Sequence, residues 1–137
     1  MTRVYSETGR VLLAMYKHLD GYPTGIGDDL KRFLMDMKRV NRPPQEGDDG
    51  EEEYSSMDML AGKLYFFFQA EYSDVYQHQP DAADQEWTYN IYPDGDGLRL
   101  EVKNSFTHNT YHNGTLDNFN PMQVEEMYHG DEVDENA

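Results

Sequence analysis

The chain lacks several features that define large classes of proteins. None of its 137 residues is a cysteine, which excludes disulfide frameworks, thiolate metal sites and cysteine nucleophiles. Its apolar runs, such as Val11–Ala14 and Leu64–Phe68, are far shorter than the roughly 20 residues that cross a bilayer. The first 25 residues place charges around a short apolar run, so we expect no signal peptide and a cytoplasmic protein.

Basic residues are also scarce. The chain has 11 Lys and Arg against 27 Asp and Glu, a formal net charge of −16. This excess argues against direct binding to nucleic acid or to an anionic membrane, since both need positive charge, and it favours a basic partner or simply solubility. The acids are unevenly placed. Residues 1–44 hold eight basic and five acidic side chains, whereas residues 45–137 hold three basic and 22 acidic ones.

The first 44 residues predict a hairpin, a loop and a helix. Val11–His18 is a candidate strand, and Arg3–Tyr5 would pair with it across a turn. The glycines and the proline of Asp20–Gly27 indicate a loop. A helix is expected from about Asp28 to Val40, because apolar residues recur there at helical spacing and Asn41–Pro44 would stop it.

The middle of the chain predicts a second helix and a second hairpin. After an acidic linker at 45–54, a helix is expected from about Ser56 to Tyr72. The three consecutive phenylalanines at 66–68 cannot all face one core, so part of that ring surface must meet another partner. Trp87–Ile91 and Leu98–Val102 alternate apolar and polar residues on either side of a Pro-Asp-Gly-Asp-Gly turn. That pattern is typical of a hairpin with one face on the core and one in water.

The remainder of the chain predicts a weakly ordered extension, residues 105–137. Asn120-Pro121 is typical of a helix start, and a short helix to about Tyr128 should precede an acidic tail at His129–Ala137. Together these signals predict an α+β fold for residues 1–104. We expect a single domain with an antiparallel sheet of about four strands and two main helices on one face.

The loop before the first predicted helix holds one set of candidate site residues: His18, Asp20, Tyr22, Gly25 and Gly27. A Gly-rich turn that leads into a helix can offer backbone N–H groups to an anion, and His18 with Asp20 could form an acid–base pair. One hypothesis is therefore a small-ligand protein that binds a nucleotide or signal molecule, or an enzyme built on this loop. Against it, the spacing matches no phosphate-binding loop and no Lys or Arg lies within it. A tightly packed structural turn is the alternative.

The same segment resembles a known family. The run Tyr16-x-His18-x-Asp20-Gly21-Tyr22-Pro23-x-Gly25-x-Gly27 is similar to the strand–loop–helix pattern H-x-D-G-Y-P-x-G-x-G of small, largely uncharacterised phage and bacterial proteins. Met57–Ala61 and Glu86-Trp87-Thr88-Tyr89 resemble two further segments, so the similarity covers roughly residues 10–103. Leu19 stands where members commonly have Trp. The resemblance implies the fold and a phage or mobile-element source, hence the host cytoplasm, and it implies no activity.

Other kinds of chemistry find little support in the sequence. His108 and His112 are four residues apart, but in a predicted loop this spacing does not put both rings on one face. Asp94–Gly97 lacks the later ligands of a calcium loop, and no serine lies in a nucleophile elbow. We therefore expect no metal site, no cofactor and no catalytic residue, and a protein that is not an enzyme.

Two acidic runs give the second set of candidate residues. These candidate partner-binding residues are Glu46, Asp48, Asp49, Glu51, Glu52, Glu53, Tyr54, Asp131, Glu132, Asp134 and Glu135. Such runs are usually solvated, but spaced carboxylates could also imitate DNA phosphates, with interleaved aromatics as anchors. The leading hypothesis is a non-enzymatic, DNA-mimic-like phage protein that binds and inhibits a basic, nucleic-acid-handling host factor, for instance one of a defence system. A third interpretation is a homo-oligomeric structural accessory protein.

Overall fold

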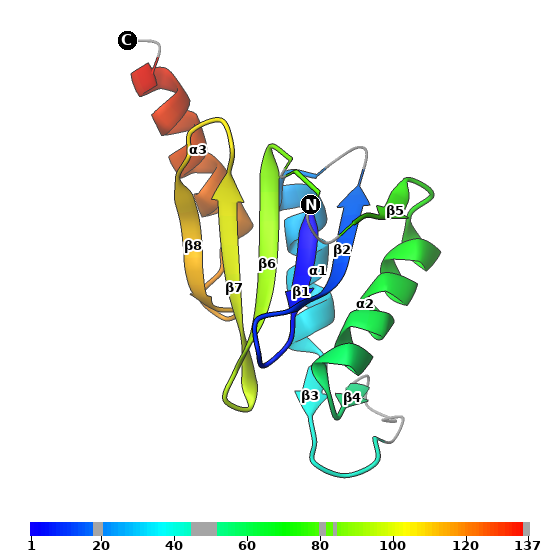
Figure 1. Ribbon diagram of the computed structural model, residues 1–137. Coiled ribbons are helices and arrows are strands. Elements are labelled where there is room, and N and C mark those ends of the chain that lie inside the picture. The colour runs from blue at the N-terminus through cyan, green and yellow to red at the C-terminus, as the bar shows by residue number, and fades with distance from the viewer. Residues whose placement is uncertain (18–20, 45–51, 80–81, 84, 136–137) are drawn as a thin grey trace.

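The computed structural model describes residues 1–17, 21–44, 52–79, 82–83 and 85–135, without the side chains of residues 132–135. Within these ranges the chain has an α+β fold (Figure 1). The strands are β1 (Thr2–Tyr5), β2 (Val11–Lys17), β3 (Met37–Arg39), β4 (Glu52–Tyr54), β5 (Val75–Gln77), β6 (Trp87–Asp94), β7 (Gly97–Asn104) and β8 (Thr110–Thr115). The helices are α1 (Asp28–Met35), α2 (Met57–Glu71), α3 (Pro121–Glu135) and a one-turn π-helix, η1 (Pro23–Gly27).

The main sheet corrects the predicted one. It has six strands in the order β5-β2-β1-β6-β7-β8, and it is mixed, because β1 pairs with β6 in parallel while the other neighbours pair antiparallel. The prediction of about four antiparallel strands failed for a physical reason. Each hairpin has a local signal, but the parallel contact between two hairpins joins segments far apart in the chain, which periodicity does not report.

The strand pairing of both predicted hairpins is confirmed. The face of β6 that was expected in water is instead buried at Thr88 and Asn90, because β6 lies inside the sheet between β1 and β7. β1 pairs with β2, with Val4 opposite Leu13. β6 pairs with β7 from Trp87 opposite Asn104 to Asp94 opposite Gly97, so the turn itself is only Gly95 and Asp96. Gly95 has a φ of +58°, a conformation that glycine adopts without strain.

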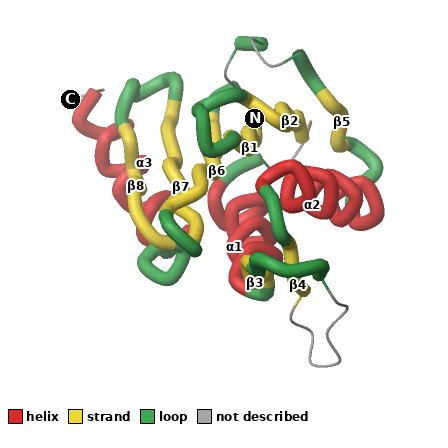
Figure 2. The backbone as a smooth tube through the Cα atoms, turned by 60° about the horizontal axis from the view of Figure 1, so that its bottom comes forward, coloured by secondary structure: helices red, strands yellow, loops and turns green. Residues whose placement is uncertain are grey.

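The first helix and the linker that follows it differ from their predictions. α1 ends at Met35 rather than near Val40, and β3 (Met37–Arg39) pairs in parallel with β4 (Glu52–Tyr54), inside the predicted linker. The apolar spacing continues past Met35, but the backbone of β3 gains strand hydrogen bonds from β4. Figures 1 and 2 show this small sheet at the ends of α1 and α2. The predicted linker residues 45–51 lie outside the described residues.

The second and third helices begin as predicted. Ser56 caps α2, its side-chain oxygen accepting from the Met59 backbone N–H at 3.2 Å, and Asn120 caps α3 by accepting from the Gln123 N–H at 3.2 Å. α3 is longer than the expected short helix to Tyr128, since it continues to Glu135. Its later part is tied to the sheet, because Tyr111 of β8 donates to the Asp131 carboxylate at 2.6 Å. β8 was not predicted, since its sequence is polar and Gly-containing.

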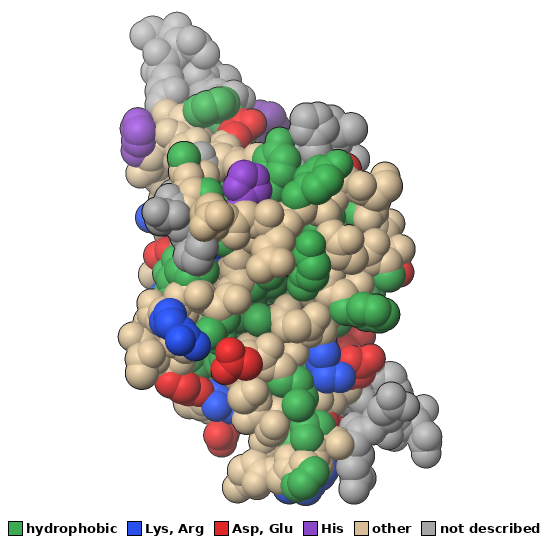
Figure 3. All heavy atoms as spheres, turned by 45° about the vertical axis from the view of Figure 1, so that its right-hand side comes forward, with side chains coloured by type: hydrophobic (Ala, Val, Ile, Leu, Met, Phe, Trp, Pro, Cys, Tyr) green, Lys and Arg blue, Asp and Glu red, His purple; other side chains and the backbone are tan. Residues whose placement is uncertain are grey.

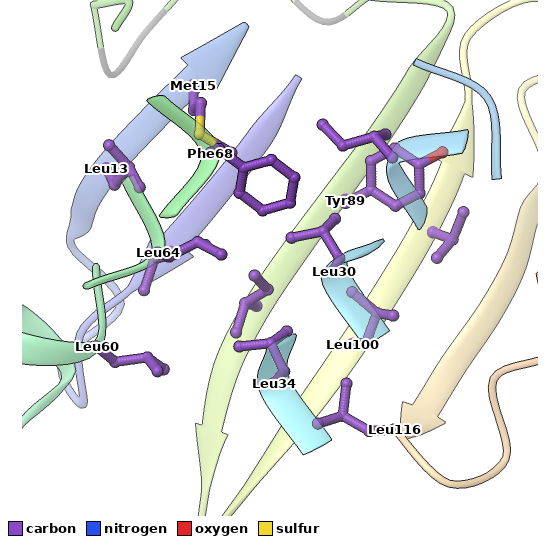
Figure 4. Packing of buried hydrophobic residues seen from close by; sticks show 14 of the residues in the cluster. Leu13, Met15, Leu30, Leu34, Leu60, Leu64, Phe68, Tyr89, Leu100 and Leu116 are labelled. Atoms are coloured by element: carbon purple, nitrogen blue, oxygen red, sulfur yellow. The ribbon is translucent and has the colours of Figure 1, made fainter. Parts of the chain in front are cut away.

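All three α-helices pack on one face of the main sheet. Figure 1 shows α1 behind β1 and β6 and α3 behind β7 and β8, and Figure 2 shows α1 next to α2. In Figure 4 the buried side chains of α1 and α2 point towards those of the strands: Leu30, Leu34, Leu60, Leu64, Phe68, Leu13, Met15, Tyr89 and Leu100. Burying one such side chain contributes about 1.5–3 kcal/mol, so this single core stabilises every layer of the fold.

One ionic group is buried at the end of β2. The side chain of Lys17 is 4% exposed, and its Nζ lies 3.2 Å from the Asp74 carboxylate. The same Nζ lies 4.4 Å from the centre of the Tyr72 ring. Because a buried ammonium needs a partner to offset its lost hydration, Asp74 holds the connection between α2 and β5 against β2.

Candidate functional site

The described part of the Gly-rich loop, residues 21–27, packs against the core. His18 and Asp20 lie outside the described residues, Tyr22 is exposed, and Gly25 lies in η1. Gly27 is buried. A Cβ placed on it would come within 3.3 Å of both the Phe119 and the Tyr89 rings. A side chain at position 27 would therefore crowd both rings, which favours the structural interpretation of this part of the motif.

The same loop also fixes α3 in place. The Glu125 carboxylate of α3 accepts from the Thr24 backbone N–H at 2.8 Å and from its hydroxyl at 2.6 Å. Lys31 of α1 donates to the Phe119 carbonyl at 2.6 Å, and the Tyr89 hydroxyl donates to the Gly21 carbonyl at 2.8 Å. A negative charge is favoured at the N-terminal end of a helix, and here the chain's own Glu125 supplies it.

The acidic candidate residues have diverse positions. Glu46, Asp48, Asp49 and Glu51 lie outside the described residues, and of Glu132, Asp134 and Glu135 only the helical backbone is described. Glu53 binds the Arg42 guanidinium through two oxygens, at 2.8 and 2.7 Å. Tyr54 is buried in the core, which raises its pKa. Asp131 accepts from Tyr111 and Asn109. Glu52 lines a depression on the surface between α1 and α2.

That depression is a groove of about 630 Å³ between α1 and α2, to which β3 and β4 each contribute one lining residue. Its walls and floor are formed by Asp29, Arg32, Phe33, Asp36, Met37, Glu52, Phe67, Glu71 and Tyr72. The core-facing stripes Leu30–Leu34 and Leu64–Phe68 draw the two helices together. Phe33 and Phe67 stand beside those stripes and meet with their ring centres 4.9 Å apart. They form an apolar floor between the two helices.

The groove carries more negative than positive charge. Four carboxylates line it against a single guanidinium, that of Arg32. Arg32 is bound to Asp29, and this hydrogen bond, followed by the charges of Asp29, Asp28 and Glu71, raises its pKa. Glu52 forms an ion pair with Lys63 at 3.6 Å. Within the described part of the chain, no ion-pair partner is found for Asp36 or Glu71.

Apart from Glu52, the sequence did not nominate the residues of this groove, although it held a signal for them. Phe67 belongs to the phenylalanine run that could not all face one core. Phe67 and Glu71 are four residues apart on α2, and Asp29 and Phe33 are four apart on α1, so each pair shares a helix face. What the sequence could not report is that those two faces lie side by side.

The face of the sheet opposite the helices carries an aromatic stack. The Tyr5 and Tyr92 ring centres are 4.5 Å apart, and the Arg99 guanidinium lies 4.3 Å from the Tyr92 ring centre. Burial, together with the charge of Glu101 and the neighbouring Tyr5, raises the pKa of Tyr92 to about 12. Since β6 lies between β1 and β7, Tyr92 is flanked by side chains of both neighbouring strands, Tyr5 of β1 and Arg99 of β7.

Figure 3 shows one side of the molecule, on which exposed hydrophobic side chains are scattered among polar ones and most of the charged side chains lie in the lower half. Single exposed apolar residues of this kind are common on protein surfaces. The groove between α1 and α2 is the strongest candidate site, because it combines the packed rings of Phe33 and Phe67 with four carboxylates.

Comparison with known proteins found no matching family model, no matching curated protein and no matching solved structure. In the described residues, no group of three or more His, Asp or Glu side chains is placed to hold a metal ion. None of the helices in the described ranges combines the length and apolar character needed to cross a bilayer.

Proposed function

We propose that this protein is a non-enzymatic binding protein that takes a basic segment of another protein into the groove between α1 and α2. The observation that carries the proposal is the groove itself, where four carboxylates surround an aromatic floor and two of them have no ion-pair partner among the described residues.

The lining fits Lys and Arg side chains in two ways. Their charged heads would meet carboxylates, and their aliphatic stems would lie on Phe33 and Phe67, because long basic side chains bury their stems on apolar surface. A cation close to an aromatic face gains a further attraction. The Asp36 and Glu71 carboxylates are exposed, so a partner can approach them without displacing part of the core.

The partner class follows from the charge of the whole chain. A net charge of −16 steers basic surfaces towards the protein and repels polyanions. Proteins that handle nucleic acid present clustered Lys and Arg to phosphates, so we propose one of them as the partner. When the groove holds the basic segment of the partner, that segment can no longer bind nucleic acid. The protein would therefore inhibit its partner by imitating the nucleic acid.

The test is the binding of a fluorescent oligo-lysine peptide, measured by anisotropy at low and at high salt. The double variant Asp36→Asn, Glu71→Gln removes two charges from the groove, and we expect it to weaken binding about tenfold. The control Asp94→Asn, Glu126→Gln removes two exposed charges elsewhere and should bind nearly as the parent does. Equal weakening in both variants would show that net charge alone attracts the peptide, and the groove proposal would be abandoned.

A further inference from the structure

Each wall of the groove has a phenylalanine one helical turn from a carboxylate. On one side Asp29 and Phe33 of α1 are followed by Asp36, the residue directly after the helix, and on α2 Phe67 is followed by Glu71. The contact between Phe33 and Phe67 aligns the middles of the two patterns.

The ends of the groove are aligned by separate observations. Glu71 is the last residue of α2 and lies one helical turn beyond Phe67, on the side away from β4, so it belongs to the end where α1 begins. The Glu52 backbone N–H donates to the Asp36 carbonyl at 3.0 Å, so Asp36 and Glu52 belong to the end where α1 stops. One carboxylate that lacks an ion pair within the described ranges therefore stands at each end, Glu71 at the first and Asp36 at the second.

The separation of the two ends can be obtained from helix geometry. Asp29 and Asp36 are seven residues apart. Because a helix rises 1.5 Å per residue, the two ends of the groove are about 10 Å apart along the axis of α1. On a partner helix this is the spacing of residues i and i+7, which lie on one face with residue i+4 between them. An extended segment repeats its side chains on one face at about 7 and 14 Å, so it fits less well.

We infer that the groove recognises a helix of the partner that carries basic side chains at i and i+7 and an apolar side chain at i+4. The two basic residues meet Glu71 and Asp36, and the apolar residue rests on Phe33 and Phe67. Amphipathic helices commonly bind grooves through anchors at such positions. This inference rests on the proposed function, since it names the segment that the same groove would take.

The experiment compares helical peptides of one composition on an Ala-rich host, by fluorescence anisotropy. One peptide has Lys at i and i+7 and Leu at i+4. The second has its Lys residues at i and i+3 with Leu on the same face, and the third has the first arrangement with Leu moved to the opposite face. We expect the first peptide to bind about tenfold more tightly than either other peptide. The Asp36→Asn, Glu71→Gln protein, whose substitutions are exposed and nearly isosteric, should lose this preference; circular dichroism checks its fold.

Each outcome of this experiment decides something. If all three peptides bind equally and binding still depends on Asp36 and Glu71, the spacing inference is overturned and the proposed function stands. If no peptide binds, both fall. Spermidine and the second peptide are also used as competitors of the labelled first peptide. If spermidine displaces the first peptide at a lower concentration than the second peptide needs, the groove is a polyamine site and the helix inference is overturned.

Discussion

The substitution Gly27→Ala tests whether the Gly-rich loop is a packing device. Gly27 precedes α1 with φ −61° and ψ −41°, so alanine meets no backbone strain there. The added methyl group would lie 3.3 Å from the Phe119 ring and 3.3 Å from the Tyr89 ring. Both rings are fully buried, and the Tyr89 hydroxyl is held by its hydrogen bond to Gly21. Neither ring can move away freely.

Two opposing effects set the size of the change. Alanine in place of glycine gains up to about 1 kcal/mol from helix propensity and from a less flexible unfolded chain. Overpacking of a filled core costs about 1–3 kcal/mol. Because the two rings that must yield are both fixed, we expect a net loss of about 1–2 kcal/mol in the free energy of unfolding.

Gly62→Ala is the matched control. Gly62 lies in the exposed part of α2, and its added methyl group would meet nothing within 4 Å, so the variant should gain about 1 kcal/mol. Urea unfolding followed by the fluorescence of the single tryptophan, Trp87, measures both. The Gly27→Ala midpoint should fall by about half to one molar urea. A Gly27→Ala protein as stable as the parent, alongside a stabilised Gly62→Ala, would refute the packing argument.

Three further predictions concern other contacts of the fold. Asp74→Asn should lower the free energy of unfolding by about 3 kcal/mol, because it removes the charge of a carboxylate that lies 3.2 Å from the buried Lys17 ammonium. Glu125→Ala should cost about 1 kcal/mol in urea unfolding, since the two bonds from Thr24 are exposed. In a spectrophotometric titration, the difference between parent and Tyr92→Phe should show a phenol with a pKa of about 12. Folding raises the pKa of the Tyr92 phenol from 10.0 to about 12. The contribution of Tyr92 to the free energy of unfolding is therefore complete below pH 10.0 and is lost as the pH rises towards about 12.

Each of these predictions has a control. Lys17→Met should cost less than Asp74→Asn, because the partly exposed Asp74 carboxylate can be hydrated; equal costs would contradict the buried-charge argument. Glu126→Ala, at an exposed neighbouring position in α3, should leave stability nearly unchanged, and a loss equal to that of Glu125→Ala would remove the role given to the contact with the loop. If the Tyr92 phenol instead titrates near pH 10, its ring is hydrated and the argument from burial is wrong.

The elements with local signals were predicted well from the sequence. Asn120 and Pro121 mark the start of α3, and Gly95 lies in the turn of the β6–β7 hairpin. The start of α2 was predicted within one residue, because the Ser55-x-x-Asp58 spacing favours Ser55 as its cap, whereas Ser56 is the cap. In each case the physical cause acts within a few residues: a side-chain cap, a fixed proline φ, or the positive φ that glycine allows. Such causes are visible in a single sequence.

The elements that depend on distant partners could not be predicted in the same way. Met37–Arg39 continues the apolar spacing of α1, but becomes a strand because Glu52–Tyr54 lies beside it. Thr110–Thr115 has no apolar alternation, and is a strand because β7 offers its edge. The candidate groove has the same limitation, since Asp36 and Glu71 come to line one groove only through the packing of two helices.

The central position of β1 has a consequence for synthesis. One of its two neighbours, β6, begins only at Trp87. At about 5–20 residues per second, the ribosome needs on the order of ten seconds to make the intervening chain. During that time one edge of β1 has unpaired backbone groups, and contacts between such distant segments form slowly. The yield of folded protein will therefore depend on translation rate and temperature more steeply than its final stability does.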